Sequence, residues 1–111
     1  MGALRPELSS IQMLEMPANA TAGVSFEITV TTVGSSSCTR ADGASVAVSG
    51  LVADVTPWDL VAPVGAVCTD DLAPFPRRVT LRFSGAGTAT IRLHGRGGLT
   101  YEAALTVVPA P

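Results

Sequence analysis

Two cysteines are the residues of this chain whose type and spacing most plainly carry chemistry. Cys38 and Cys68 each lie in a turn-rich segment between stretches that alternate apolar and polar residues. Loop cysteines in a small β domain most simply form one disulfide, which would close a loop of about 30 residues and stabilise the fold by roughly 3–4 kcal/mol. Two free buried thiols are the alternative. A disulfide predicts folding in an oxidising, extracytoplasmic compartment.

The remaining polar side chains do not form a recognisable catalytic or metal motif. His94, the only histidine, falls on the outward register of its strand, and we expect it to be exposed, without the partner that a general base needs. Asp54, Asp59 and the pair Asp70–Asp71 offer oxygen ligands for calcium, but they lack the spacing of a calcium loop, so a solvated acidic loop is the simpler interpretation. One histidine and two cysteines do not complete a zinc site. We therefore predict no enzyme activity, no bound metal and no cofactor.

Apolar residues gather where the regular alternation is lost, between Trp58 and Phe75. We favour the interpretation that they plug one end of the fold; the alternative is an exposed patch that binds a partner. If they are exposed, the aromatic residues would anchor the contact, because aromatic side chains dominate binding hot spots. The candidate partner-binding residues are Trp58, Leu60, Val64 and Phe75.

Composition indicates a single globular domain and argues against two classes of partner. The chain has 111 residues, of which 47% are hydrophobic and 14% charged. The net charge of −2 and the scattered arginines, without any lysine, argue against nucleic-acid binding. Mean hydropathy is +0.41, yet the longest charge-free stretches are shorter than a bilayer span. No signal segment is recognisable, so the chain is either cytoplasmic or, as we expect from the cysteines, a mature exported domain carrying an added start Met.

A period of two along the chain predicts β-strands. It is clearest over 24–30, where Val24, Phe26, Ile28 and Val30 share one face. Weaker alternation over 11–16 predicts a first strand. Further strands are expected over 46–55, 79–83, 89–93 and 101–107.

Glycine and proline set the expected boundaries of these strands. Residues 41–43 and 95–98 predict turns, Gly85–Gly87 predicts a hairpin, and Thr56–Pro57 is expected to end a strand. About seven short strands without a helical period predict an all-β fold, an immunoglobulin-like antiparallel β-sandwich of about seven strands. We expect residues 1–9 to form a tail or linker and residues 10–109 to form the domain.

Several segments resemble the strands of bacterial extracytoplasmic immunoglobulin-like domains. These segments are Ala22–Val30, Arg78–Phe83, Gly87–Arg92 and Tyr101–Val107. The chain is similar to uncharacterised, often lipid-anchored surface proteins, a resemblance that implies an exported module and no particular chemistry. It departs from antibody-type domains, in which the two cysteines lie inside facing strands with a tryptophan against the bridge.

We therefore expect a non-catalytic, exported immunoglobulin-like module for protein–protein interaction or structural spacing at the cell envelope. It would be an accessory subunit of a larger membrane-associated complex or a lipoprotein, with another envelope protein as partner, no nucleic acid and no membrane span; the oligomeric state stays open. The alternative is a carbohydrate- or small-ligand-binding β-sandwich with Trp58 and Tyr101 as stacking platforms. An aromatic content of only 5% weighs against that alternative.

Overall fold

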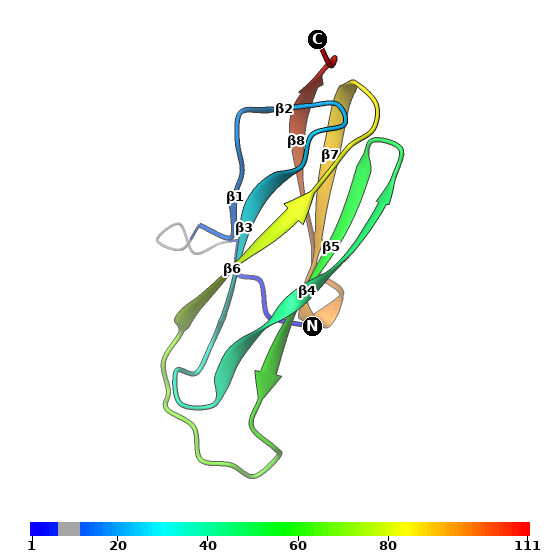
Figure 1. Ribbon diagram of the computed structural model, residues 1–111. Helices are drawn as coiled ribbons and strands as arrows, with labels where there is room; N and C mark the ends of the chain where they lie inside the picture. The colour runs from blue at the N-terminus through cyan, green and yellow to red at the C-terminus, as the bar shows by residue number, and fades with distance from the viewer. Residues whose placement is uncertain (7–11) are drawn as a thin grey trace.

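The computed structural model describes residues 1–6 and 12–111; residues 7–11, part of the expected tail and first strand, lie outside the described residues. Two β-sheets pack face to face, a three-stranded sheet in the order β1-β3-β6 and a five-stranded sheet in the order β2-β8-β7-β5-β4 (Figure 1). The elements are β1 (Leu14–Glu15), β2 (Asn19–Thr21), β3 (Phe26–Gly34), β4 (Thr39–Ser49), β5 (Val52–Val61), β6 (Ala73–Leu81), β7 (Gly87–His94), the 3-10 helix η1 (Arg96–Gly98) and β8 (Thr100–Val108). The predicted all-β architecture is confirmed.

Two strand pairings depart from the expected antiparallel arrangement. β2 pairs with β8 in parallel, and β5 pairs with β7 in parallel, whereas the other ladders are antiparallel. The parallel β5–β7 pairing arises because β5, and not β4, is the strand of the β4–β5 hairpin that lies next to β7. β4 is then the edge strand of the sheet. Because the β2–β8 and β5–β7 ladders are parallel, the expectation of a purely antiparallel sandwich is wrong.

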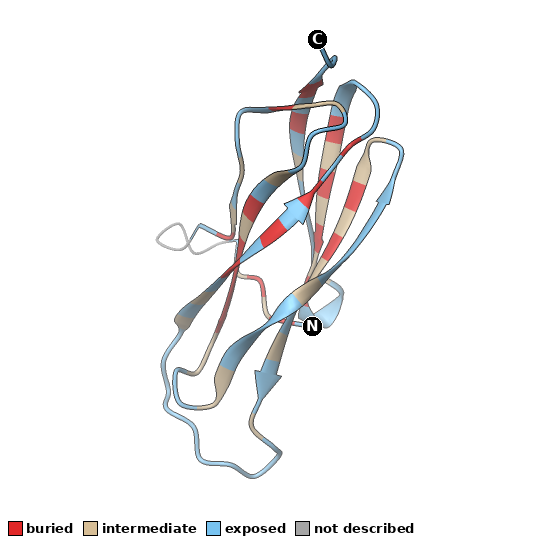
Figure 2. Cartoon of the chain, viewed as in Figure 1, coloured by how far each residue is buried: buried red, intermediate tan, exposed pale blue. Residues whose placement is uncertain are grey.

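The core lies between the sheets and follows the predicted alternation. Figure 2 shows buried positions recurring along the strands. The inward-facing side chains that are almost completely buried include Ile28, Val30, Val55, Leu81, Phe83, Ile91, Leu93, Leu105 and Val107. Burying each large apolar side chain contributes about 1.5–3 kcal/mol. Val24 is an exception: it precedes β3 and is 55% exposed, contrary to its expected inward register.

β5 is longer than the sequence predicts because Pro57 does not end it. Strands normally exclude proline, which has no N–H for the ladder. Here β7 pairs with β5 only as far as Val55. Pro57 lies beyond the end of the β5–β7 ladder, so its missing N–H leaves no partner unpaired in that ladder. The carbonyl of Pro57 accepts a hydrogen bond from the N–H of Gly2 at 2.8 Å instead.

Two predicted turns have different roles in the structure. Residues 41–43 form a bulge inside β4, where the register to β5 shifts between Ala41 and Ala44. Gly85–Gly87 does not close a hairpin, because β6 and β7 belong to different sheets and this turn carries the chain across the sandwich. The turn over 95–98 does connect neighbouring strands, β7 and β8, as predicted.

Part of the expected N-terminal tail packs into the sandwich. The N–H of Gly2 donates to β5, and the carbonyl of Ala3 accepts a hydrogen bond from Val33 of β3 at 3.0 Å. Leu4 is only 4% exposed. Residues 2–4 therefore bridge the two sheets where β7 has ended and β5 continues without it.

Candidate functional site

The predicted disulfide is confirmed. Cys38 and Cys68 are bonded, with their Cα atoms 5.6 Å apart. The bond joins the two segments that cross between the sheets at one end of the molecule, residues 35–38 after β3 and residues 62–72 before β6 (Figure 1). We call these two segments together the disulfide end.

Hydroxyl groups and one carboxylate reinforce the disulfide end. The N–H of Thr69 donates to Ser37 Oγ at 2.9 Å, and the Thr69 hydroxyl donates to Asp71 Oδ1 at 2.6 Å. The N–H of Ser36 donates to the same carboxylate oxygen at 3.1 Å. These hydrogen bonds from Thr69 and Ser36 lower the pKa of Asp71 below its ordinary value, because they favour the charged carboxylate. The far part of the long loop is thus fixed to the turn after β3.

The middle of the long loop presents apolar side chains to solvent. Val64 and Val67 are fully exposed, with relative exposures of 107% and 97%. Val61, the last residue of β5, and Leu72, the last residue of the loop, are about half exposed. The favoured interpretation, that the apolar residues of this region plug the sandwich, is therefore wrong for the loop, and the alternative of an exposed patch fits it.

The four candidate partner-binding residues do not form one surface. Trp58 and Leu60 are exposed on the outer face of β5, and Trp58 Nε1 donates to Ser45 Oγ on β4 at 2.7 Å. Val64 lies in the loop of residues 62–72 and is fully exposed. Phe75 is partly buried on the inner face of β6, in register with Thr32. Only Trp58 and Leu60 are brought together.

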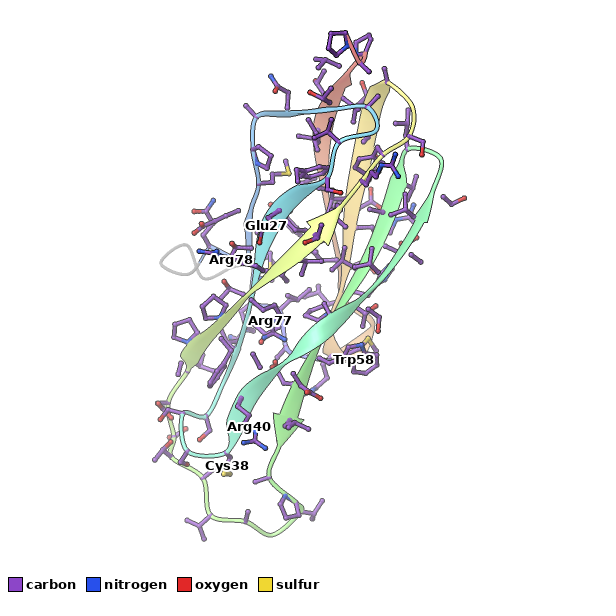
Figure 3. All side chains as sticks on the ribbon, in the orientation of Figure 1. Glu27, Cys38, Arg40, Trp58, Arg77 and Arg78 are labelled. Atoms are coloured by element: carbon purple, nitrogen blue, oxygen red, sulfur yellow. A yellow bond between two sulfur atoms is a disulfide. The ribbon has the colours of Figure 1, made fainter. Side chains whose placement is uncertain are left out.

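A shallow depression of about 280 Å³ lies beside the disulfide. Its walls come from the start of β4 and the end of β5, which pair there through Arg40 and Leu60. The lining residues are Ser37, Cys38, Thr39, Arg40, Leu60, Val61 and Ala62. The depression therefore offers one cationic side chain, Arg40, and apolar side chains that include Leu60. Figure 3 labels Arg40 and Cys38 at this end of the molecule.

A buried ion pair between Asp59 and Arg77 was not predicted from the sequence. Arg77 Nη2 lies 2.8 Å from Asp59 Oδ1, and the two side chains are 6% and 0% exposed. The hydroxyl of Thr32 donates to Asp59 Oδ2 at 2.8 Å. Arg77 also donates to the carbonyls of Trp58 at 2.5 Å and Phe75 at 2.7 Å. Figure 3 shows Arg77 between the sheets.

The strand alternation contained a signal for this pair. Arg77 shares the inward register of Val79 and Leu81, and Asp59 shares that of Val55 and Pro57. Inward charges of opposite sign on strands of facing sheets indicate a buried pair, because an unpaired buried charge is very costly. The sequence interpretation instead placed Asp59 in a solvated acidic loop.

His94 has a partner, contrary to expectation. Its Nε2 lies 2.7 Å from Asp54 Oδ1 on the outer face of the five-stranded sheet. Arg92 lies between two carboxylates there, 3.6 Å from Asp54 and 3.4 Å from Glu102. The parallel pairing of β5 with β7 brings these side chains together. Exposed ion pairs of this kind contribute about 0–1 kcal/mol each.

The calcium candidates are dispersed through the molecule. Asp54 is on a sheet face, Asp59 is in the interior, and Asp71 is bonded within the disulfide end. Within residues 1–6 and 12–111, no three histidine, cysteine or acidic side chains are grouped to hold a metal ion. In the same ranges, no helix has the length and apolar character needed to cross a bilayer.

The two proposed sugar-stacking residues point to opposite faces of one sheet. Trp58 is on the outer face of β5, whereas Tyr101 pairs with the buried Leu93 and shares its inward register. They do not form a common platform. In comparisons with known proteins, no family model, no curated protein and no solved structure matched the chain.

Proposed function

We propose that this protein is a non-catalytic, exported immunoglobulin-like module whose disulfide end binds another protein of the cell envelope. The observation that carries the proposal is the full exposure of Val64 and Val67 on a loop held by a disulfide. Apolar side chains on a restrained loop suit binding, because less conformational entropy is lost when the partner docks. The adjoining depression, with Arg40 and Leu60, adds a polar contact and an apolar one.

The shape of the molecule supports a role in presentation or spacing. The domain measures 54 × 24 × 21 Å, and the C-terminal residue lies at the opposite end of the long axis from the disulfide end (Figure 1). A module attached through its C-terminal side would therefore hold the disulfide end far from the attachment point. This geometry suits an accessory subunit of a membrane-associated complex.

The immunoglobulin-like assignment rests on the order of part of the strands. The sheet β1-β3-β6 corresponds to the first, second and fifth strands of such sandwiches, and β7 and β8 are neighbours as their last two strands are. The parallel β5–β7 pairing is a departure, so we propose a variant of the fold. Export is supported by the disulfide, since such bonds persist mainly in oxidising compartments.

Two measurements test the proposal. For export, a thiol titration of unfolded, unreduced protein from its own cells should find no free thiol; two thiols would contradict it. For binding, the tagged domain should capture an envelope protein from its own source, and V64S/V67S should lose that protein. The matched control is V24S, because Val24 is an exposed valine outside the disulfide end. Equal capture by all three proteins would refute binding through the loop.

A further inference from the structure

The edge formed by β4 is longer and less protected than the other sheet edges of the described residues. The edge strands β1 and β2 have 2 and 3 residues, and β6 carries Pro74 and Pro76. β4 has 11 residues, and its first half carries Arg40, Asp42 and the bulge. Its segment Ser45–Ser49 is exposed throughout and contains neither a charge nor a proline (Figure 2). Soluble proteins usually block long edges with charges, prolines or bulges, because an open edge pairs with other strands.

The backbone groups on the open edge can be identified from the hydrogen bonds of β5. The carbonyl of Leu51 accepts a hydrogen bond from β7 at 2.8 Å. The N–H and C=O groups of successive residues point alternately to the two sides of a strand. Asp54, three residues after Leu51, therefore directs its N–H and C=O toward β4, where its partner is Ala47. The neighbours of Ala47, which are Val46 and Val48, therefore direct their N–H and C=O groups away from β5, toward the open edge.

The sequence of this edge reads the same in both directions: Ser-Val-Ala-Val-Ser over 45–49. A contact between identical chains about a two-fold axis requires a self-complementary surface. Antiparallel pairing centred on Ala47 sets Val46 of one chain opposite Val48 of the other, and each of their outward backbone groups then finds a partner. We propose that a second copy of this chain docks along β4 in this register and joins the two five-stranded sheets into one.

The side chains fit the same register. Val46 and Val48 lie on the inner face, in register with the buried Val55 and Ala53, yet they are 41% and 43% exposed. Pairing would set each of these valines beside one from the other chain, which removes apolar surface from water. The small Ala47 on the outer face leaves room for close approach at the axis. This interface does not involve the disulfide end and is independent of the proposed function.

Sedimentation of the purified chain across a concentration series tests the proposal. We expect the mass to rise from 11.3 kDa to twice that value as concentration increases. A47K and A47E should each weaken association at least about tenfold, because like charges would face each other at the axis. Mixing the two variants in equal amounts should restore the dimer. The matched control is T80K, on the outer face of the three-stranded sheet, which should associate as the native chain does.

A second variant tests the backbone pairing itself. V48P removes an N–H that points to the open edge and has no partner on β5, so the monomer should fold while association is lost. A native chain that stays at 11.3 kDa up to about 1 mM would overturn the proposal. The β4 edge would then be open only to a strand of a different protein. A dimer that withstands A47K and A47E separately would place the interface elsewhere, and it would overturn the proposal equally.

Discussion

The two halves of the sandwich are filled by different kinds of side chain. Where β7 and β8 face β3 and β6, the interior is apolar and includes Ile28, Leu81, Phe83, Ile91 and Leu93, all 2% exposed or less. Toward the disulfide end, beyond the end of β7, the interior holds Arg77, Asp59 and Thr32. We call these the apolar half and the polar half. Apolar burial is non-directional, whereas a buried charge pair is stable only with its hydrogen bonds in place.

The position of Arg77 follows from irregularities in the strands around it. The bulge in β4 falls opposite Trp58, and Arg77 donates to the carbonyls of both Gly43, in the bulge, and Trp58. Its donation to the carbonyl of Phe75 adds a contact within β6. Arg77 thus bonds to backbone groups of three strands, because its guanidinium has several donors in a rigid plane. The strands of the polar half are therefore held together through one side chain, that of Arg77, whereas among the described residues the apolar half has no such central residue.

The largest effect should come from removing Asp59. D59A leaves Arg77 buried without its counterion, and such a change typically costs about 3–5 kcal/mol of unfolding free energy. Urea unfolding measures this loss. The matched control is D54A, which removes a partly exposed aspartate from the same strand and should cost at most about 1 kcal/mol. Equal losses in the two variants would mean that the polar half does not depend on its ion pair.

The double variant D59L/R77M sharpens the comparison between the halves. It replaces the ion pair with apolar side chains and makes the polar half resemble the apolar half. Replacing both charges is often neutral or stabilising, so we expect it to recover most of the stability that D59A loses. A double variant as unstable as D59A would show that the hydrogen bonds of Arg77 to backbone carbonyls carry the stability instead.

The disulfide should have the next largest effect. C38S/C68S releases a loop with a sequence separation of 30, which the chain-entropy estimate values at about 3–4 kcal/mol. Because the apolar core lies at a distance from this bond, we expect the variant to stay folded with a lower melting temperature. Circular dichroism during heating tests this expectation. Loss of the β-sheet signal at 25 °C would show that the apolar half is not stable without the disulfide.

The apolar half could be predicted from the sequence far better than the polar half. Alternation located the inward side chains of 79–83 and 89–93, because burial on one sheet face imposes a period of two. The same period also points Asp59 and Arg77 inward, but the sequence does not reveal which inward charges meet across the sheets. The path of the chain after Gly85 was also missed, since a glycine turn serves a hairpin and a crossover between sheets equally well.

The exposed loop was misjudged for a related reason. Val64 and Val67 are apolar, and apolar residues are usually buried. The structure leaves both side chains uncovered, on a loop that the disulfide ties to the turn after β3. The disulfide itself was predicted from the positions of the two cysteines. The path of the chain between the two cysteines depends on how the sheets are arranged, and the residues near the cysteines do not determine it.

A small effect on stability should follow substitution of the exposed valines. V64S/V67S removes apolar groups that are already in water in the folded state, so the unfolding free energy should change by no more than about 0.5 kcal/mol. The comparison is I91V, a smaller chemical change in the apolar half, which should cost about 0.5–1.5 kcal/mol. Chemical denaturation of both variants tests the order. A larger loss for the surface pair would indicate that the valines pack against the protein.

The smallest expected effect is a change in the pKa of Asp71, without loss of the fold. Hydrogen bonds from Thr69 and Ser36 lower its pKa, so NMR titration of the carboxyl group should give a midpoint below 3.8. T69V removes the first of these donors and should move the midpoint back toward 3.8. Since the pKa is lower in the folded state, the carboxylate stabilises the fold above its unfolded pKa, and this contribution is lost as the pH falls through the folded value. An unchanged midpoint in T69V would mean that the Thr69 hydroxyl does not hold the carboxylate, and that the N–H of Ser36 is its main donor.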